Sequence, residues 1–166
     1  MKIKRILIGI DDSKFAEHAA EYGFDIAHTY KAHVGLVHVV EPITIPANPS
    51  SDIVLTPPTI TGIDEMDILN IQSHASETLL ERTAKRLGGG LEITEFNQFG
   101  DTADGIVEAA KEFSADLIVI GTHSRSGLDR LLMGSVAEHV VRHSPVPVLV
   151  VPHSESESQE DRKSER

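Results

Sequence analysis

The stretch GTHSRSGLDRLLMGS, from Gly121 to Ser135, contains the residues of this chain whose types and spacing most readily suggest chemistry. It holds three glycines, three serines and two arginines, and it follows a continuous apolar run. Glycine permits positive φ angles and lets a ligand approach the backbone closely, and arginine adds positive charge. The segment is therefore either a phosphate-binding loop or a flexible turn before a helix.

The helix expected after this loop favours an anion site. The sequence SVAE predicts a capping box, with Ser135 as the N-cap and Glu138 at the third helical position. The N-terminus of a helix presents unpaired N–H groups and a partial positive charge, which suit a phosphate oxygen. Plain turn geometry stays open as an alternative, because the capping box already satisfies one amide and the spacing matches neither the dinucleotide-binding nor the Walker A glycine pattern.

Short apolar runs rich in β-branched residues predict buried strands, at residues 5–10, 33–40, 116–121 and 146–151. Continuous apolarity is typical of strands that are covered on both faces, as in a parallel sheet. Residues 91–96 alternate apolar and polar side chains, which predicts a further strand at a sheet edge. Helical patterns lie between the strands, at residues 13–30, 64–87, 101–113 and 135–143.

This alternation predicts an α/β fold, with a five-stranded parallel open sheet and helices on both faces, as in Rossmann-like proteins. Ligands of such sheets bind outside the carboxyl ends of the strands, where the winding direction reverses. We expect one domain at residues 1–152, with a long proline-rich loop at 42–62, and a disordered polar tail at 153–166.

Composition excludes several classes of function. The chain has 166 residues, 40% of them hydrophobic and only 4% aromatic, so one domain with an aliphatic core is expected. A net charge of -11 disfavours nucleic acid and anionic membranes as partners, and the absence of cysteine excludes thiol catalysis. No apolar run approaches the roughly 20 residues that span a bilayer. We predict a cytoplasmic protein without nucleic-acid binding or membrane insertion.

Three adjacent polar residues end the first predicted strand. Asp12 or Ser13 is expected to cap the first helix, while Asp11 can point into the crevice or assist a nucleotide-bound Mg²⁺. His139 and His143 have the i, i+4 spacing of a zinc pair, but the accompanying glutamate is missing, so we predict no metal site. We also predict no catalytic residue, because no base-activated serine is recognisable.

Several motifs together resemble the universal stress protein family: ILIGIDDS near the N-terminus, LVHVVEP, and GSVAEHVVRHSPVPVLVV near the end. In this family the signature loop has a glycine, two residues, a second glycine, nine residues, and then Gly-Ser or Gly-Thr. Here the series reads Gly121, two residues, Ser124, nine residues, then Gly134 and Ser135. The spacing is kept, but the second glycine is serine. The resemblance covers nearly all of residues 2–151 and is weakest at 42–62.

The resemblance implies an adenine nucleotide alpha hydrolase-like fold and an ATP site at the strand ends. Carried over position by position, it puts Asp11 on the ribose and Ile10 and Val39 beside the adenine. Gly121 would lie at the ribose and the first phosphate. Around the phosphates it implies Ser124, Arg125, Gly134, Ser135 and Val136.

Ser124 is the departure that bears on this site. If the position needs a positive φ, serine costs about 1 kcal/mol or more relative to glycine. Its hydroxyl can, however, donate a hydrogen bond to a phosphate oxygen. The substitution therefore leaves ATP binding open.

Two hypotheses follow. In the first, the chain is a dimeric stress-response module that binds ATP, with or without Mg²⁺, hydrolyses it slowly at most, and signals to an unknown protein partner. The resemblance implies that the homodimer forms through the last strand, from Val146 to Val151. In the second, it binds no nucleotide and is a protein-interaction or chaperone-like dimer that uses residues 42–62. A ligase or hydrolase that depends on an adenine nucleotide and has a related fold is disfavoured, because such enzymes need further catalytic machinery for which this length leaves little room.

Overall fold

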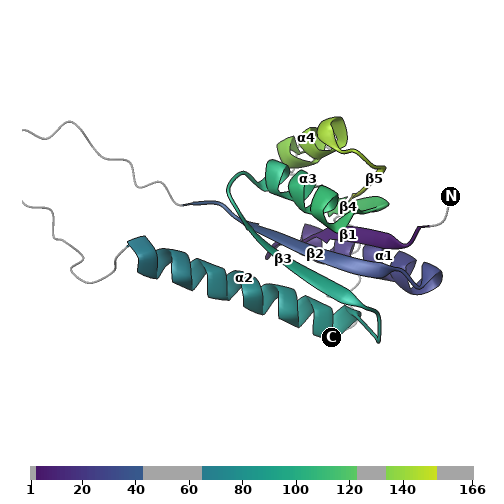
Figure 1. Ribbon diagram of the computed structural model, residues 1–166, viewed down its shortest axis with the longest axis horizontal. Helices are drawn as coiled ribbons and strands as arrows, with labels where there is room; N and C mark the ends of the chain where they lie inside the picture. The colour runs from purple at the N-terminus through teal and green to yellow at the C-terminus, as the bar shows by residue number, and fades with distance from the viewer. Residues whose placement is uncertain (1–2, 43–64, 123–133, 153–166) are drawn as a thin grey trace, which may run out of the picture.

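The sheet forms where the chain carries continuous aliphatic runs, and the helices form between them (Figure 1). The computed structural model describes residues 3–42, 65–122 and 134–152. The predicted alternation of strands and helices is confirmed in these segments. In chain order the elements are β1 (Arg5–Gly9), α1 (Lys14–Tyr30), β2 (His33–Val40), α2 (Glu65–Leu87), β3 (Ile93–Phe99), α3 (Thr102–Phe113), β4 (Leu117–Gly121), α4 (Ser135–His143) and β5 (Val148–Val151).

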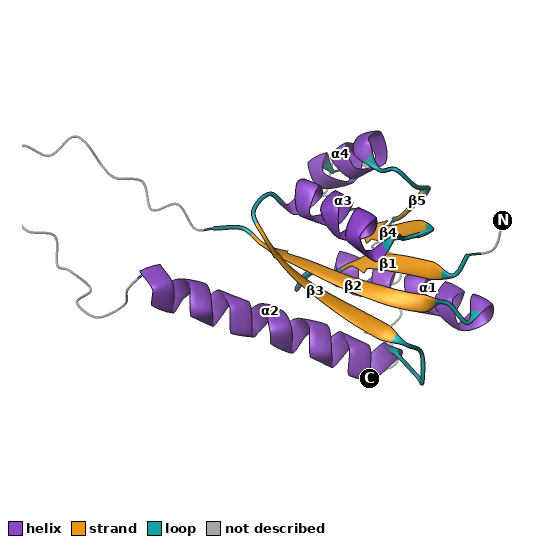
Figure 2. Ribbon diagram, viewed as in Figure 1, coloured by secondary structure: helices purple, strands orange, loops and turns teal. Residues whose placement is uncertain are grey.

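All four strand pairings are parallel, and the order across the sheet is β3-β2-β1-β4-β5. Helices α1 and α2 cover one face and α3 and α4 cover the other (Figure 2). Each face has its own aliphatic core, since successive strand residues point to opposite sides. The predicted α/β fold with helices on both faces is confirmed, and the predicted edge strand is β3.

The direction of winding reverses between β1 and β4, and a carboxylate helps to set their register. Asp116 accepts hydrogen bonds from the backbone N–H groups of Lys4 (2.8 Å) and Arg5 (2.9 Å). The bond from Lys4 is the main reason that the pKa of Asp116 lies below its usual value. Ile6 then pairs with Leu117 in the parallel ladder. The carboxyl ends of β1 and β4 are thereby brought level.

The three helices that begin at this edge with a described N-cap differ in how the cap is made. Ser13 caps α1 by accepting a hydrogen bond from Ala16 N, and Asp101 caps α3 by accepting one from Asp104 N. Helix α4 has Gly134 at its N-cap and no side-chain capping bond. The prediction that Ser135 is the N-cap of a capping box is wrong: the helix starts one residue earlier, and Ser135 is its first residue.

Gly121 ends β4 where the strand meets the start of α1. A Cβ atom at this position would lie 2.6 Å from the carbonyl oxygen of Phe15 and 2.9 Å from its carbonyl carbon. Neither Gly121 nor Gly134 adopts the positive φ that glycine permits, because neither is among the positive-φ glycines of the described segments. Gly121 is required instead by the close approach of two backbones.

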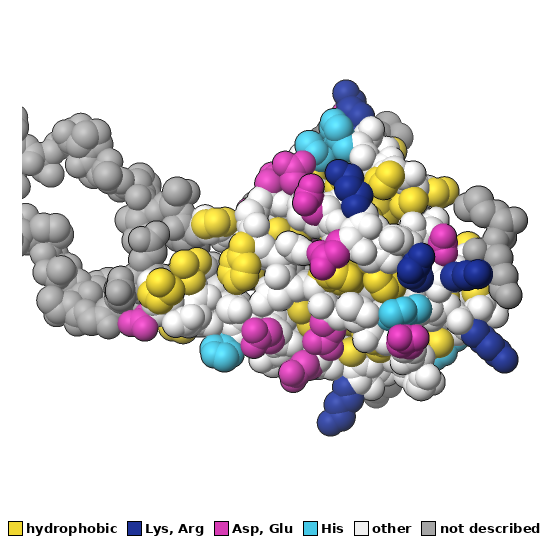
Figure 3. Space-filling model, viewed as in Figure 1, with side chains coloured by type: hydrophobic (Ala, Val, Ile, Leu, Met, Phe, Trp, Pro, Cys, Tyr) yellow, Lys and Arg dark blue, Asp and Glu magenta, His cyan; other side chains and the backbone are white. Residues whose placement is uncertain are grey.

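Hydrophobic side chains are exposed over the N-terminal end of α2 (Figure 3). Met66 and Ile71 are 63% and 64% exposed to solvent, and Phe99 at the end of β3 is 50% exposed. Within the described segments, no helix is long and apolar enough to cross a bilayer. The predicted loop at 42–62 and the predicted tail at 153–166 lie outside these segments, apart from Pro42.

Replacing Gly121 by alanine should reduce the free energy of unfolding by about 1–3 kcal/mol, because the added methyl group overpacks against backbone that cannot move freely. Urea denaturation measures the change. Gly23→Ala is the matched control, since its Cβ meets side-chain atoms only, of Ile8 at 2.7 Å and Val119 at 3.5 Å, and alanine favours the helix. An equal loss in the two variants would contradict the importance of the backbone contact.

Candidate functional site

A cavity of about 780 Å³ opens at the carboxyl ends of β1, β2 and β4. This is the edge at which the winding reverses, so the location agrees with the rule for ligand sites in open parallel sheets. Its volume is in the range of pockets that hold a small molecule. Helices α1, α2, α3 and α4 all contribute to its walls.

Seven of the predicted site residues line this cavity: Ile10, Asp11, Val39, Gly121, Gly134, Ser135 and Val136. They come from β1, β2, β4 and α4 and the segments that follow or precede them, so the fold gathers residues that are far apart in the sequence. The two other predicted residues, Ser124 and Arg125, lie outside the described residues.

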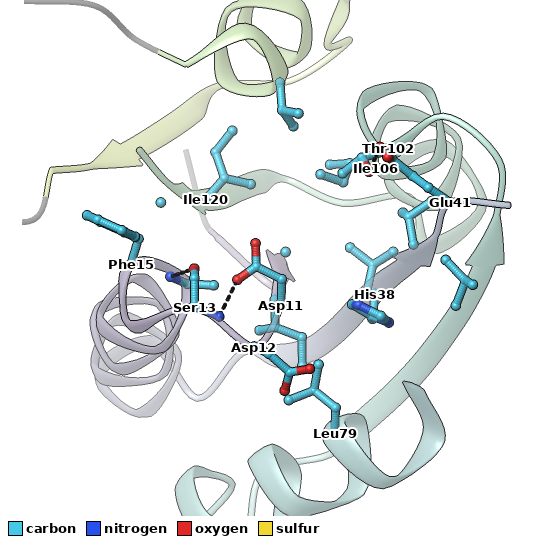
Figure 4. Close-up of a pocket in the computed structure, with 18 of the residues that line it drawn as sticks. Asp11, Asp12, Ser13, Phe15, His38, Glu41, Leu79, Thr102, Ile106 and Ile120 are labelled. Atoms are coloured by element: carbon cyan, nitrogen blue, oxygen red, sulfur yellow. Dashed lines mark hydrogen bonds between the residues drawn. The ribbon is translucent and has the colours of Figure 1, made fainter. Parts of the chain in front are cut away.

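The two carboxylate oxygens of Asp11 have different surroundings, since one bonds to the backbone and the other faces the cavity. One oxygen, Oδ1, accepts a hydrogen bond from the backbone N–H of Ser13 at 2.7 Å, and so fixes the turn into α1. The other oxygen points toward Ile120 into the cavity (Figure 4). The predicted cap at the start of α1 is confirmed for Ser13. Asp11 therefore presents a charged acceptor whose position is held by the backbone.

The first turn of α4 supplies donors to the same cavity. Its first helical hydrogen bond runs from Glu138 N to the carbonyl oxygen of Gly134 (2.9 Å). The amides of Ser135, Val136 and Ala137 precede that bond and have no partner within the described part of the chain. Unpaired amides at the positive end of a helix dipole attract an anion.

The remaining walls are largely apolar. Ile10 and Val39 are 7% and 8% exposed, and a flat group between them would be shielded from water. Further aliphatic side chains come from the helices and from β4, at Leu79, Ile106 and Ile120. An apolar chamber with a carboxylate and a set of amide donors can hold a ligand that has an apolar part, hydroxyl groups and an anion.

Sequence reasoning missed the contributions of His38, Gln72 and Thr102 to this cavity. Burial lowers the pKa of His38, and the charges of Asp12 and Asp11 oppose that shift without cancelling it. His38 lies in the predicted strand at 33–40, so the β-period could have placed it on the same side as Leu36. Gln72 had no comparable signal, because only the packing of α2 shows which of its polar residues turn inward.

The model of the universal stress protein family matches residues 2–152. The chain belongs to this family. A universal stress protein of Methanocaldococcus jannaschii is 32% identical over 151 residues, which cover 89% of this chain and 81% of that protein. The resemblance seen in the sequence is therefore confirmed along the whole domain.

Solved universal stress proteins share the fold. One in complex with cAMP has a TM-score of 0.67 and 23% identity, covering 93% of this chain and 100% of that chain. Another, from Archaeoglobus fulgidus in complex with dAMP, has a TM-score of 0.56 and 23% identity, covering 91% of this chain and 99% of that chain.

The histidine pair on α4 makes contacts of its own. His139 Nε2 lies 2.9 Å from the Asp104 carboxylate on α3, and the ring of His143 lies 4.1 Å from that of His139. In addition, Nδ1 of His143 lies 2.9 Å from the carbonyl oxygen of His139. No group of three or more metal-ligating side chains occurs among the residues that the structure describes. The pair links α4 to α3.

Acidification should destabilise the protein through His38. The folded state binds a proton at His38 less readily than the unfolded state, so the free energy of unfolding falls as the pH drops below about 6.5 toward the lower folded pKa. Urea denaturation at several pH values measures this slope. His38→Phe, which cannot titrate, should flatten it below about pH 6.5. An unchanged slope in the variant would show that other groups cause it.

Proposed function

We propose that this universal stress protein binds an adenine nucleotide in the cavity at the carboxyl edge of its sheet. Proteins of the same fold have been solved with cAMP and dAMP, which share an adenine, a sugar and a phosphate. The residues of this cavity suit each of those parts in turn, and ATP is the nucleotide that we infer from the family resemblance. The bound state would be passed to a protein partner rather than used in metabolism.

The observation that carries the proposal is the uncapped start of α4. Ser13 and Asp101 cap α1 and α3 with their own side chains, whereas α4 leaves its first amides without a partner in the described segments. The residues that carry those amides line the cavity, and Asp11 lines it as well. A nucleotide phosphate would accept from the amides, and ribose hydroxyls would donate to Asp11.

The base would lie among the apolar side chains. Ile10 and Val39 are buried at adjacent strand ends, and a purine between them would lose its contact with water.

A Mg²⁺ ion that accompanies a nucleotide is usually bound by phosphate oxygens and by only one or two carboxylates of the protein. Asp11 and Asp12 line the cavity and would supply these carboxylates. No group placed to activate water is evident among the described residues that line the cavity, and we propose that hydrolysis is slow at most.

We also propose that the protein is a homodimer through β5. This strand forms one free edge of the sheet, and Val148, Leu149 and Val150 are only partly buried. An aliphatic edge with unpaired backbone groups favours pairing with a second copy. The universal stress protein resemblance supports the same edge.

The nucleotide site can be tested at a single amide. Ser135→Pro removes one N–H group, and the fold tolerates proline at the first helical position, since Gly134 already has φ of -51° and ψ of 155°. Loss of a hydrogen bond to a charged phosphate should weaken ATP binding by about 10-fold or more. Isothermal titration of the nucleotide-stripped protein with ATP and Mg²⁺ measures the affinity.

Ser135→Ala is the control, because it removes the hydroxyl but keeps the amide; it should bind more tightly than Ser135→Pro. Asp11→Ala should weaken ATP binding, because the ribose hydroxyls would lose the carboxylate that accepts their hydrogen bonds. If the unmodified protein does not bind ATP, the proposal fails. Binding by Ser124→Gly alone would then attribute the failure to that serine and favour the protein-interaction hypothesis.

The dimer can be tested by placing a charge on β5. Val148→Lys should convert the dimer to a monomer, since two lysines would be brought together at an apolar strand pair. Analytical ultracentrifugation gives the mass, and circular dichroism shows whether the fold persists. Phe99→Lys on the opposite edge, where Phe99 is half exposed, is the matched control and should keep the dimer. A dimer that survives Val148→Lys would exclude this interface.

A further inference from the structure

A chain of hydrogen bonds connects the cavity to the far side of α2. His38 Nδ1 lies 2.7 Å from the hydroxyl of Ser76, which donates to Asn97 Oδ1 at 2.8 Å. Asn97 Nδ2 donates to Ser73 Oγ at 3.1 Å, and Ser73 donates to the carboxylate of Glu77 at 3.4 Å. The chain thus joins β2, α2 and β3, and Ser76 at its centre is 1% exposed.

The amide of Asn97, which accepts through Oδ1 and donates through Nδ2, gives this chain its direction, and the longer contact of Ser73 with the Glu77 carboxylate agrees with it. A carboxylate only accepts, so the single hydroxyl hydrogen of Ser73 goes to Glu77 and its oxygen accepts from Asn97. The amide oxygen of Asn97 must then accept the hydrogen of Ser76. Ser76 is left with only a lone pair for His38, so the proton of the neutral imidazole lies on Nδ1.

This tautomer determines what His38 offers to the cavity. Nε2 carries a lone pair and no hydrogen, and it has no partner in the described segments. His38 lines the cavity and lies on the same side as Asp11 and Asp12 (Figure 4). Burial favours the uncharged ring. His38 is therefore a fixed hydrogen-bond acceptor on this wall.

A second acceptor lies on the adjacent helix. Gln72 also lines the cavity, one turn before Ser76 on α2. Its Oε1 atom is buried and has no hydrogen-bond partner among the described residues. A buried acceptor without a partner is costly, and a ligand N–H group would remove that cost. The β2 and α2 wall thus presents two acceptors in an otherwise apolar setting.

We propose that His38 Nε2 and Gln72 Oε1 select the exocyclic amine of a 6-aminopurine and reject a 6-oxopurine. An amine has two N–H donors and matches two acceptors, whereas an oxo group has only lone pairs and would leave both acceptors unpaired. Discrimination by a fixed hydrogen-bonding group is strong because the wrong ligand desolvates it without compensation. The inference rests on the proposed nucleotide site and names the residues that read its base.

The test compares ATP with ITP, which differ at C6 by an amine against an oxo group. Isothermal titration of the full chain should give at least about tenfold tighter binding of ATP. His38→Phe and Gln72→Met should each weaken ATP binding several-fold while changing ITP binding less than about twofold. His33→Phe, at the other end of the same strand, is the matched control and should keep the preference.

The outcomes separate the two proposals. If the unmodified protein binds neither nucleotide, the proposed function fails and this inference fails with it. If it binds ATP and ITP equally, or if both variants keep the preference, the site stands and the base-reading role is overturned. Nitrogen NMR of the unmodified protein provides a readout that does not depend on the variants folding: His38 should show a protonated Nδ1, and only ATP should shift the Nε2 resonance.

Discussion

The close approach of β4 to the start of α1 is the contact on which the arrangement of the site depends. At Gly121 the strand comes within contact distance of the Phe15 carbonyl group, which no larger residue would allow. This contact packs the start of α1 against the end of β4, which the parallel ladder places beside the end of β1, where Asp11 turns into α1. The reversal of winding at these two strands creates the space between the helices. The topology therefore determines where the cavity lies, and the side chains determine its lining.

Side-chain chemistry then differs among the helices that surround this space. Helices α1 and α3 complete their own first turns, and α4 does not. On the opposite side, the polar side chains of α2 are tied to β3 through Asn97 and Ser76. One end of the cavity thus presents donors and the other presents oriented acceptors. An adenine nucleotide is complementary to this arrangement, because its phosphate accepts hydrogen bonds at one end and the amine of its base donates them at the other.

Much of this arrangement could be predicted from the sequence. Continuous aliphatic runs determine parallel strands covered on both faces, and the order of elements then determines which strand ends meet. The family resemblance implied that Asp11, Val39 and Ser135 lie together at these strand ends, and they line one cavity. The cap of α4 was predicted at the wrong residue, because Ser135 fits both the N-cap and the first helical position, and only backbone angles distinguish them. The direction of the His38 chain depends on contacts among three elements, which periodicity does not encode.

The uncapped α4 also affects the thermodynamics of the fold. A serine or aspartate at an N-cap stabilises a helix by about 1 kcal/mol relative to alanine and by roughly a few tenths of a kcal/mol relative to glycine, so Gly134 forgoes only a small contribution in a helix of nine residues. An anion that completes the first turn binds the folded state alone and adds to its stability by mass action. An anion bound in the proposed site would therefore order the first turn of α4, and the contact of His139 with Asp104 would link that effect to α3. Among the described residues this helix end lacks a capping partner, so under the proposed function its stability would depend on the ligand.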